Sequence, residues 1–354
     1  MYHKISKKIK FSNNFKISET SKTFIVAEIS GNHSGKIENV FKSIDEIKKA
    51  GADAVKIQSY QPDTITVDSK NKHFFIKDKS IWKGQYLYDL YKKSYTPFSW
   101  HKRIFLYARS KNLLCFSSPF DLSSLKILEK NRCPIYKIAS PEIQDLELVG
   151  SVAKTKKPII ISTGIADNRD IALAIKECLK HKNNKIILLN CISSYPAKST
   201  ELNLRNILEL KKFCPIVGYS DHSNGNLAAI SSVSLGAKIV EKHFILNKKI
   251  KSADKKFSIT SKKFFNFVKE IRLVEKMLGN KKVNKKKLLK NKLTTITRSL
   301  FYSEDLKKGY RIKRDKLLSI RPGIGISPQM LSKILGKKLK RNVKKNTPVQ
   351  KKDF

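Results

Sequence analysis

The chain has 354 residues, of which 40% are hydrophobic, so it can bury a large core and form one to three domains. Its formal charge of +45, from 74 basic and 29 acidic residues, is typical of nucleic-acid-binding proteins. Only eleven of the basic residues are arginine, although specific phosphate and base recognition favours the arginine fork. We therefore expect no nucleic-acid partner and keep that class as an alternative hypothesis resting on charge alone.

The cysteines and the amino terminus predict where in the cell the protein is found. The five cysteines are dispersed, with no CxxC pair and no metal-finger spacing, which predicts reduced thiols in a cytoplasmic protein. The chain has no run of about 18 apolar residues, and its lysine-rich start lacks the apolar stretch of a signal peptide. We expect a soluble, cytoplasmic protein without a membrane partner.

Short apolar runs and amphipathic stretches alternate along the chain after a polar, basic segment at 1–22, which predicts a β-ribbon or a loose lead-in. The runs are continuous rather than alternating, as in strands buried on both faces. The predicted strands are Phe24–Ile29, Ala54–Gln58, Leu114–Ser118, Ile135–Ile138, Pro158–Ser162, Ile186–Asn190, Pro215–Tyr219 and Ala237–His243. The predicted helices are Ile37–Ala50, Pro97–Asn112, Ser123–Asn131, Leu146–Lys154, Arg169–His181, Leu204–Phe213, Gly225–Leu235 and Ser261–Leu278.

Eight βα units in series favour a (β/α)8 TIM barrel over residues 1–280, with an open doubly wound sheet as the alternative. Two connections are longer than usual, Ser59–Thr96 and Asn247–Thr260, and long loops on this scaffold commonly serve as lids or subunit contacts. A charge-rich linker is expected over 281–293. The remaining residues, 294–354, predict a small second domain of short strands and turns.

Two histidines follow neighbouring predicted strands, His222 in Gly218–Ser223 and His243 in Glu241–Phe244. Neighbouring parallel strands lie roughly 4.8 Å apart, so two such imidazoles can converge on one ion. We therefore predict a divalent metal held by His222 and His243. The opposing interpretation is that both are ordinary buried histidines.

Other polar residues also gather where the predicted strands end, although charged groups in buried strands are costly unless they are used. Lys56 and Lys137 supply point charges that suit a phosphate and a carboxylate. Glu28 and Glu142 can bind hydroxyls or transfer a proton. Hydroxyl donors complete the predicted anion site: Ser118, Ser140, Ser162 and Ser220.

Several of these segments together resemble the sialic acid synthase family. The matching segments are Ile25–Gly35, Gly51–Gln58, Phe116–Phe120, Tyr136–Ser140, Ile161–Gly164, Tyr219–His222 and Val240–Phe244. Residues 298–347, with Arg321-Pro322-Gly323 as a marker, resemble the antifreeze-like (SAF) domain of the same family. The resemblance covers nearly the whole chain in the same order and implies a TIM barrel followed by a SAF domain.

Within that family, Ile81–Tyr91 and Tyr95–Pro97 look like the branch that makes pseudaminic acid. Legionaminate and sialate synthases usually carry Gly-Gly-Pro-Asp in the loop after the eighth strand, whereas this chain has Lys251-Ser252-Ala253-Asp254. The resemblance therefore implies condensation of phosphoenolpyruvate with 2,4-diacetamido-2,4,6-trideoxy-altrose, with cleavage of the C–O bond and a Mn or Mg ion. N-acetylneuraminate or legionaminate synthesis from another acetamido sugar is the alternative.

The resemblance also assigns roles to single residues. It implies catalytic roles for Glu28, Lys56 and Lys137, and metal ligation by His222 and His243. It implies phosphoenolpyruvate contacts from Lys56, Ser118, Lys137, Ser140, Ser162 and Ser220, and sugar contacts from Glu142, Tyr195, Asp254 and Arg321. Arg321 would come from a partner subunit, which implies a domain-swapped homodimer. The product is expected to enter a carbohydrate such as a flagellin glycan, a capsule or lipopolysaccharide.

Overall fold

A computed structural model describes residues 4–12, 15–78, 80–279 and 293–354. The chain divides into two compact units, Met1–Leu278 and Gly279–Phe354. The linker expected over 281–293 lies outside the described residues, apart from Leu293.

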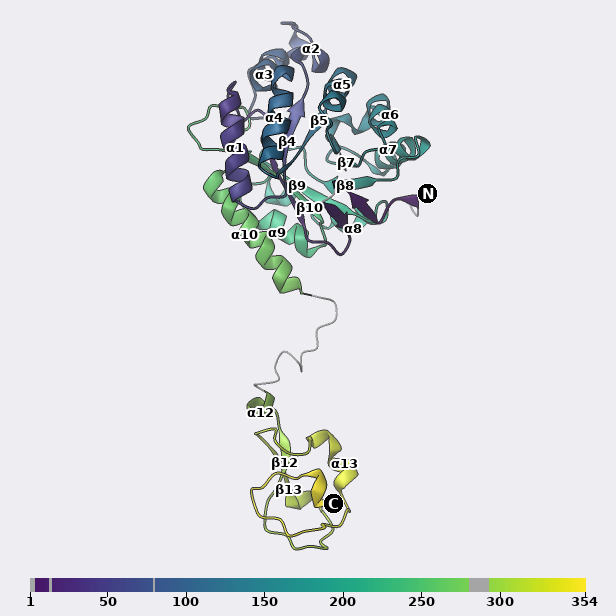
Figure 1. Cartoon of the computed structure of the whole chain (residues 1–354), viewed down its shortest axis with the longest axis vertical. Helices are drawn as coiled ribbons and strands as arrows, with labels where there is room; N and C mark the ends of the chain where they lie inside the picture. Colours follow the sequence, from purple (N-terminus) through teal and green to yellow (C-terminus); the bar gives the residue numbers. More distant parts are fainter. Residues whose placement is uncertain (1–3, 13–14, 79, 280–292) are drawn as a thin grey trace. The chain divides into compact units, whose positions relative to one another are not determined.

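The first unit is a closed barrel of eight parallel strands (Figure 1). The strands are β3 (Phe24–Glu28), β4 (Ala54–Ser59), β5 (Leu114–Pro119), β6 (Tyr136–Ile138), β7 (Ile159–Ser162), β8 (Ile186–Asn190), β9 (Val217–Asp221) and β10 (Ile239–Ile245). Each strand pairs with the next along the chain, and β10 pairs with both β9 and β3, which closes the ring. The predicted (β/α)8 barrel is confirmed, and the open-sheet alternative is wrong.

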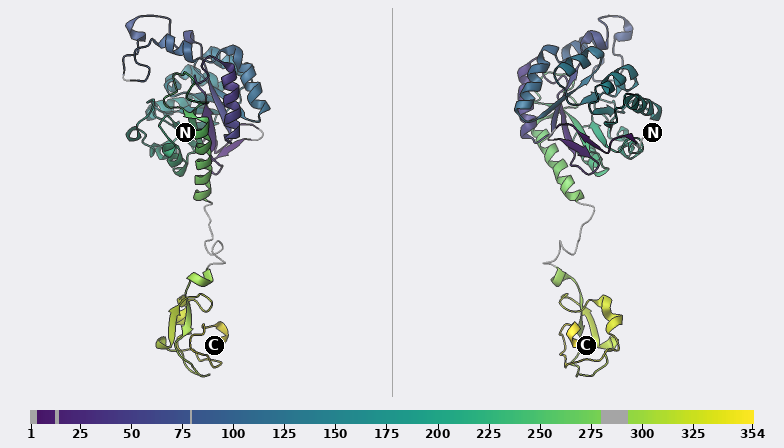
Figure 2. Two further views of the ribbon diagram at one scale, coloured as in Figure 1. Left: turned by 90° about the vertical axis from the view of Figure 1, so that its left-hand side faces the viewer. Right: turned by 45° about the vertical axis from the view of Figure 1, so that its right-hand side comes forward.

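Helices cover the outside of the ring of strands (Figures 1 and 2). They are α1 (Ile37–Lys49), α4 (Phe98–Ser110), α5 (Leu122–Lys130), α6 (Leu146–Lys154), α7 (Asn168–Lys180), α8 (Asn206–Leu210), α9 (Leu227–Ser234) and α10 (Ser261–Leu278). In α7 the Asp167 side chain accepts hydrogen bonds from the first-turn amides. The helix then buries Ile171, Ala174, Ile175 and Cys178 at helical spacing against the barrel.

The last two barrel strands begin and end two residues later than the apolar pattern predicts. Val217–Asp221 replaces the expected Pro215–Tyr219, and Ile239–Ile245 replaces Ala237–His243. The ladder continues through polar residues because their side chains find buried partners, as Asp221 does with Lys242. The carboxyl ends of these strands therefore carry more polar groups than a hydrophobic run can indicate.

The predicted amino-terminal ribbon is a hairpin of β1 (Lys8–Lys10) and β2 (Lys16–Ser18). The long Ser59–Thr96 connection holds α2 (Pro62–Ile65), α3 (Leu87–Ser94) and a 3-10 turn, η2 (Lys72–Phe74). Two further 3-10 turns, η3 (Pro141–Gln144) and η4 (Ser199–Glu201), and the short strand β11 (Ile259–Thr260), beside β10, complete the unit. None of the helices in the described part of the chain combines the length and apolarity needed to cross a bilayer.

The second unit has its own small core. Two antiparallel strands, β12 (Ser299–Tyr302) and β13 (Leu317–Ile320), accompany the short helices α12 (Leu293–Ile296) and α13 (Leu331–Ile334). Its 3-10 turns are η5 (Arg314–Lys316), η6 (Pro328–Met330) and η7 (Lys351–Asp353). The buried Tyr302 hydroxyl donates to Asp353 Oδ2 at 3.0 Å, which ties the first strand to the last turn.

Candidate active site

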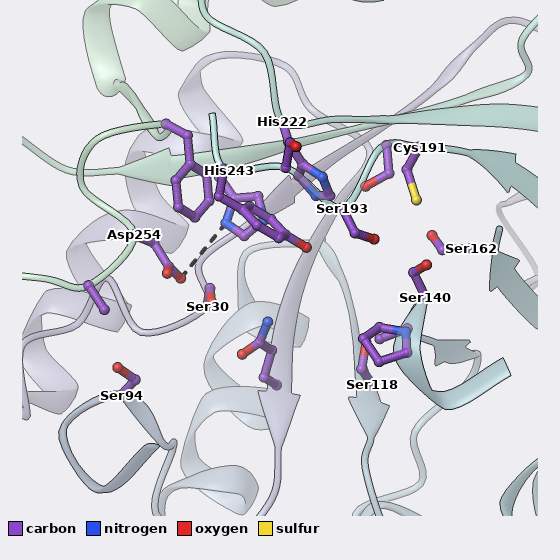
Figure 3. Close-up of a pocket in the computed structure, with 18 of the residues that line it drawn as sticks. Ser30, Ser94, Ser118, Ser140, Ser162, Cys191, Ser193, His222, His243 and Asp254 are labelled. Atoms are coloured by element: carbon purple, nitrogen blue, oxygen red, sulfur yellow. Dashed lines mark ion pairs between the residues drawn. The ribbon is translucent and has the colours of Figure 1, made fainter. Parts of the chain in front are cut away.

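A cavity of about 860 Å³ is lined by residues at the carboxyl ends of the barrel strands (Figure 3). Most of the predicted site residues line it: Lys56, Ser118, Lys137, Ser140, Glu142, Ser162, Tyr195, Ser220, His222, His243 and Asp254. Glu28 does not line the cavity, because it is fully buried against Lys56. Arg321 belongs to the second unit, where it is exposed. The structure thus gathers residues from six of the eight barrel strands, and from the loops after the other two, at one surface.

The cavity floor is a buried cluster of two carboxylates and two lysines. Glu28 pairs with Lys56, and Glu241 Oε1 lies 3.6 Å from both Lys56 Nζ and Lys137 Nζ. Ser220 donates to the same Glu241 oxygen at 3.0 Å. Glu241 Oε2 has no hydrogen-bond partner among the described residues, which is unusual for a buried carboxylate and points to a ligand.

The charges in this floor shift one another's pKa values. Burial raises the pKa of Glu28 to about 7, although Lys56 opposes the shift. Burial would also raise the pKa of Glu241, but Lys137 and Lys56 outweigh it and hold that pKa below its ordinary value. The pKa of Lys137 is lowered by burial, but the nearby Glu241 opposes that change. Glu28 is thus the group in the floor suited to exchanging a proton near neutral pH.

Glu241 is not among the residues predicted for the site. The sequence contains one indication of a role for Glu241. Glu241 and His243 lie on either side of Lys242 in β10, so the Glu241 and His243 side chains face the same side of the sheet. That side is the barrel interior, where Glu241 contacts the lysines and His243 lines the cavity. The strand therefore delivers two functional side chains rather than one.

The two predicted metal ligands lie together, with ring centroids 5.4 Å apart. His222 Nδ1 lies 2.7 Å from the Ile192 carbonyl oxygen, which only accepts, so Nδ1 carries the proton and Nε2 is the basic nitrogen. His243 Nδ1 has no hydrogen-bond partner among the described residues and lies 3.9 Å from Asp254 Oδ2 (Figure 3). Burial lowers the pKa of His222 to about 4 and that of His243 well below its ordinary value. Both rings are therefore neutral, which is the form that binds a metal.

The donor set fits a divalent ion that keeps open positions. Within the described residues, no group of three or more His, Cys, Asp or Glu side chains converges as a closed metal cage would. Two imidazoles above a cluster of acids and hydroxyls leave the other positions to oxygen ligands from substrate or water. This arrangement is typical of a catalytic rather than a structural metal.

A buried ion pair behind the two histidines holds their strands in register. β9 and β10 pair in parallel with Lys242 opposite Asp221. Lys242 Nζ lies 2.7 Å from Asp221 Oδ2 and donates to the Ser223 carbonyl at 2.6 Å, and Lys242 and Asp221 are fully buried. Asp221 also accepts from the Ser223 amide at 2.9 Å. His222 sits between two residues of this network, so the network fixes its backbone.

An aromatic cluster covers the histidines from the outside. The Tyr195 ring lies 4.4 Å from the His222 ring, and the Phe257 ring lies 4.7 Å from the His243 ring. Trp82 lies 5.4 Å from Tyr195 and 6.3 Å from Phe257. These three residues come from three loops that are far apart in sequence, so no local pattern could have identified the cluster.

Asn32 and His33 follow the first barrel strand but do not line the cavity. Asn32 instead donates to the Phe244 carbonyl at 2.9 Å and accepts from Ser252 at 2.6 Å, which anchors the loop after β10. His33 is buried edge-on against Trp100, with ring centroids 5.3 Å apart. Asn32 therefore supports the loop that carries Asp254, whereas His33 packs against α4.

The fold and the cavity define a class: a (β/α)8 barrel enzyme with an anion-binding floor beneath a pair of metal-competent imidazoles. The model of the NeuB family matches residues 43–283, and that of the SAF domain matches residues 297–354. The chain belongs to the NeuB family and carries a SAF domain.

Known relatives are similar over nearly the whole chain. The chain is 42% identical to a pseudaminic acid synthase of Campylobacter jejuni and 40% identical to one of Helicobacter pylori, covering 94% and 93% of this chain and 97% of each relative. An N,N'-diacetyllegionaminic acid synthase of Campylobacter jejuni is 33% identical, covering 92% of this chain and 98% of its own length. The crystal structure of an N-acetylneuraminic acid synthetase from Leptospira borgpetersenii superposes with a TM-score of 0.72 at 30% identity, covering 81% of this chain and 95% of that one.

Proposed function

We propose that this enzyme is a pseudaminic acid synthase, which joins phosphoenolpyruvate to 2,4-diacetamido-2,4,6-trideoxy-altrose and releases pseudaminic acid and phosphate. The observation that carries the proposal is the position of the lysine and serine floor directly beside two neutral imidazoles in one cavity. The higher identity to pseudaminic acid synthases than to a legionaminic acid synthase supports the choice of sugar.

The floor binds phosphoenolpyruvate in this proposal. Lys56 and Lys137 act as point charges for its phosphate and carboxylate, and Glu241 between them keeps the two ammonium groups at a fixed spacing. Directed donors come from serine hydroxyls at the ends of four strands or the loops that follow them: Ser118, Ser140, Ser162 and Ser220. Such a site orients the anion without requiring any backbone movement.

Enzymes of this family generally depend on a divalent metal, and we infer that His222 and His243 hold Mn or Mg here. The metal, when bound, polarises the aldehyde oxygen of the open-chain sugar as a Lewis acid. The protein itself orients the aldehyde, because Tyr195 and Phe257 confine the space in front of the two rings.

The bond changes balance with one water molecule. C3 of phosphoenolpyruvate attacks the aldehyde carbon, water adds at C2, and the C–O bond to phosphate then breaks. Lys56 lines the cavity and pairs with Glu28, so Lys56 takes the proton of that water as it passes one of its own to Glu28, whose pKa burial raises to about 7. The proton released in this way neutralises the former aldehyde oxygen, which becomes a hydroxyl. Lys137, with a pKa lowered by burial, is the second group able to move a proton beside the phosphate.

The sugar-side contacts come from Tyr195, Glu142 and Asp254, which all line the same cavity. Arg321 is proposed as a further contact to an N-acyl group, supplied by the partner subunit of a domain-swapped homodimer. We also propose that the enzyme works in the cytoplasm and that its product supplies a surface glycan such as that of flagellin.

The test is purified enzyme with phosphoenolpyruvate and Mn, offered each of three sugars in turn: the altrose derivative, the legionaminate precursor and N-acetylmannosamine. Phosphate release and product mass are measured, with a chelator as the control. We expect efficient turnover of the altrose derivative and none after metal removal. Faster turnover of either other sugar would contradict the choice of substrate. A duplex-binding assay at moderate salt tests the charge-based alternative, which expects tight, salt-sensitive binding.

A further inference from the structure

All of the leucine and isoleucine side chains that line the cavity come from a single segment. The connection Ser59–Thr96 contributes a set that we name the apolar wall: Ile65, Ile76, Trp82, Leu87 and Leu90. The lysines and serines of the floor line the same cavity. The lining therefore combines a charged set that suits the anion with an apolar set that an anion cannot use.

Trp82 is the best-positioned member of the apolar wall. Its indole Nε1 donates to the Ala253 carbonyl at 3.2 Å, and Ala253 directly precedes Asp254 on the loop after β10. This bond links the Ser59–Thr96 segment to the loop that faces the histidines. Because the indole is held at its polar edge, its apolar face is free to meet a ligand.

The aromatic contacts form a path that leads from the two histidines to Trp82. The two histidine rings contact Tyr195 and Phe257, and these in turn contact Trp82. A linear substrate whose aldehyde lies at the histidines therefore extends past Tyr195 and Phe257, and its far end reaches the apolar wall. Hydroxyl groups placed there would lose water without gaining full hydrogen bonding, whereas methyl groups would gain contact.

We propose that Trp82 is a specificity-determining residue, and that the apolar wall selects sugars whose far end is deoxygenated and N-acylated. This rests on the proposed function, since it assumes that the aldehyde lies at the histidines. The same segment also supplies polar lining groups: Tyr60, Asp78, Ser80, Tyr91 and Ser94. Single polar groups within an apolar surface suit amides flanked by methyl groups better than a chain of hydroxyls.

The kinetic test compares Trp82→Ala and Trp82→Phe with the wild-type enzyme. Removing the ring is expected to raise the KM for the altrose derivative roughly tenfold or more, because apolar contacts of this size discriminate substrates by 10- to 200-fold. The KM for phosphoenolpyruvate is expected to stay unchanged, and the preference over N-acetylmannosamine to fall. Trp82→Phe keeps an aromatic face and is expected to recover most of the loss.

A binding test uses the fact that the chain has only two tryptophans, Trp82 and Trp100. In Trp100→Phe, emission from Trp82 is expected to change when the altrose derivative is added and to stay constant with phosphoenolpyruvate alone. Trp82→Phe, which keeps Trp100, is the matched control and is expected to show no sugar-dependent change. This readout does not depend on turnover.

The outcomes separate the two proposals. A wild-type enzyme that turns over only N-acetylmannosamine overturns both the proposed function and the substrate class. A wild-type enzyme that uses the altrose derivative, while Trp82→Ala keeps the same sugar KM and the same preference, overturns this inference and leaves the proposed function intact. Sugar-independent emission of Trp82 in an active enzyme also overturns it.

Discussion

The two ends of the barrel are built from opposite chemistry. At the carboxyl ends of the strands, Lys56, Lys137 and Glu241 are buried around a cavity. At the amino ends, the β1–β2 hairpin packs apolar side chains against the start of β3, with Phe11 and Phe24 ring centroids 5.1 Å apart. The Ser6 amide also donates to the Asn184 carbonyl, just before β8, at 2.9 Å.

The carboxyl ends of the strands therefore serve catalysis, whereas the amino ends serve the stability of the fold. Buried charges cost free energy that paired geometry recovers only in part, whereas buried aromatic and aliphatic groups stabilise the fold directly. Substitutions at the carboxyl end should therefore change catalysis, metal binding or both. Substitutions at the amino end should change stability alone.

The largest effect is expected from His222→Ala or His243→Ala. Losing a Lewis acid worth several kcal/mol should lower kcat/KM roughly a thousandfold or more. Phosphate release and Mn binding by calorimetry would both be measured, and both should be lost while the circular dichroism spectrum is kept. His73→Ala, at an exposed histidine of the Ser59–Thr96 segment, is the control. Undiminished Mn binding in either variant would show that the metal assignment is wrong.

Lys242→Met tests whether the ion pair behind the site also supports stability. It leaves the fully buried Asp221 without its cation, which should cost about 3–5 kcal/mol in the free energy of unfolding. Because the pair fixes the backbone around His222, Mn affinity should fall roughly 10- to 100-fold as well. Urea unfolding and Mn titration measure the two effects. Asp221→Asn combined with Lys242→Met should recover part of the stability, and an unchanged single variant would contradict this role.

Phe11→Ala tests the amino end. Removing a buried ring should lower the free energy of unfolding by about 3 kcal/mol, because it leaves a cavity beside Phe24. The values of kcat and KM at a temperature well below unfolding should not change. Thermal unfolding and steady-state kinetics measure this contrast, and Phe11→Leu should lose less stability. A large fall in kcat for the folded variant would remove the distinction between the two ends.

The smallest expected effect concerns pH and Glu142. Burial raises the pKa of this cavity-lining carboxyl to about 7, so it is neutral below that pH and can donate a hydrogen bond. Above pH 7 it is charged and only accepts, so the KM for the sugar should rise by about 2- to 10-fold, the effect of one lost hydrogen bond. Glu142→Gln should flatten that rise. A wild-type KM that stays constant between pH 6 and 8 would argue against the assignment.

The sequence was sufficient for most of the fold. All eight strands and the eight helices that follow them are confirmed, because apolar runs and amphipathic stretches alternate regularly along the chain. The largest displacements are in β9, β10 and α8, where polar residues and short lengths blur the pattern. The α2 and α3 helices in the Ser59–Thr96 segment were missed, since they have only four and eight residues.

The site was predictable only where residues sit at strand ends. His222 directly follows β9, and Lys56, Lys137 and His243 lie within the last four residues of their strands, so the barrel rule alone places them at one surface. Glu241 was visible to the same rule, but its contacts to two lysines depend on strands distant in sequence. Trp82 and Phe257 lie on long loops whose path is set by tertiary contacts, which no single-sequence rule captures.

The strand β10 both closes the barrel and delivers side chains to opposite faces at successive residues. Glu241 and His243 face the interior, and Lys242 faces Asp221 behind it. A single-residue insertion or deletion before Glu241 would send the lysine inward and the acid and imidazole outward. The same alternation of side chains along β10 therefore serves both the closure of the barrel and the position of the reacting groups. Insertions are tolerated far more easily in the loops around this strand than in the strand itself.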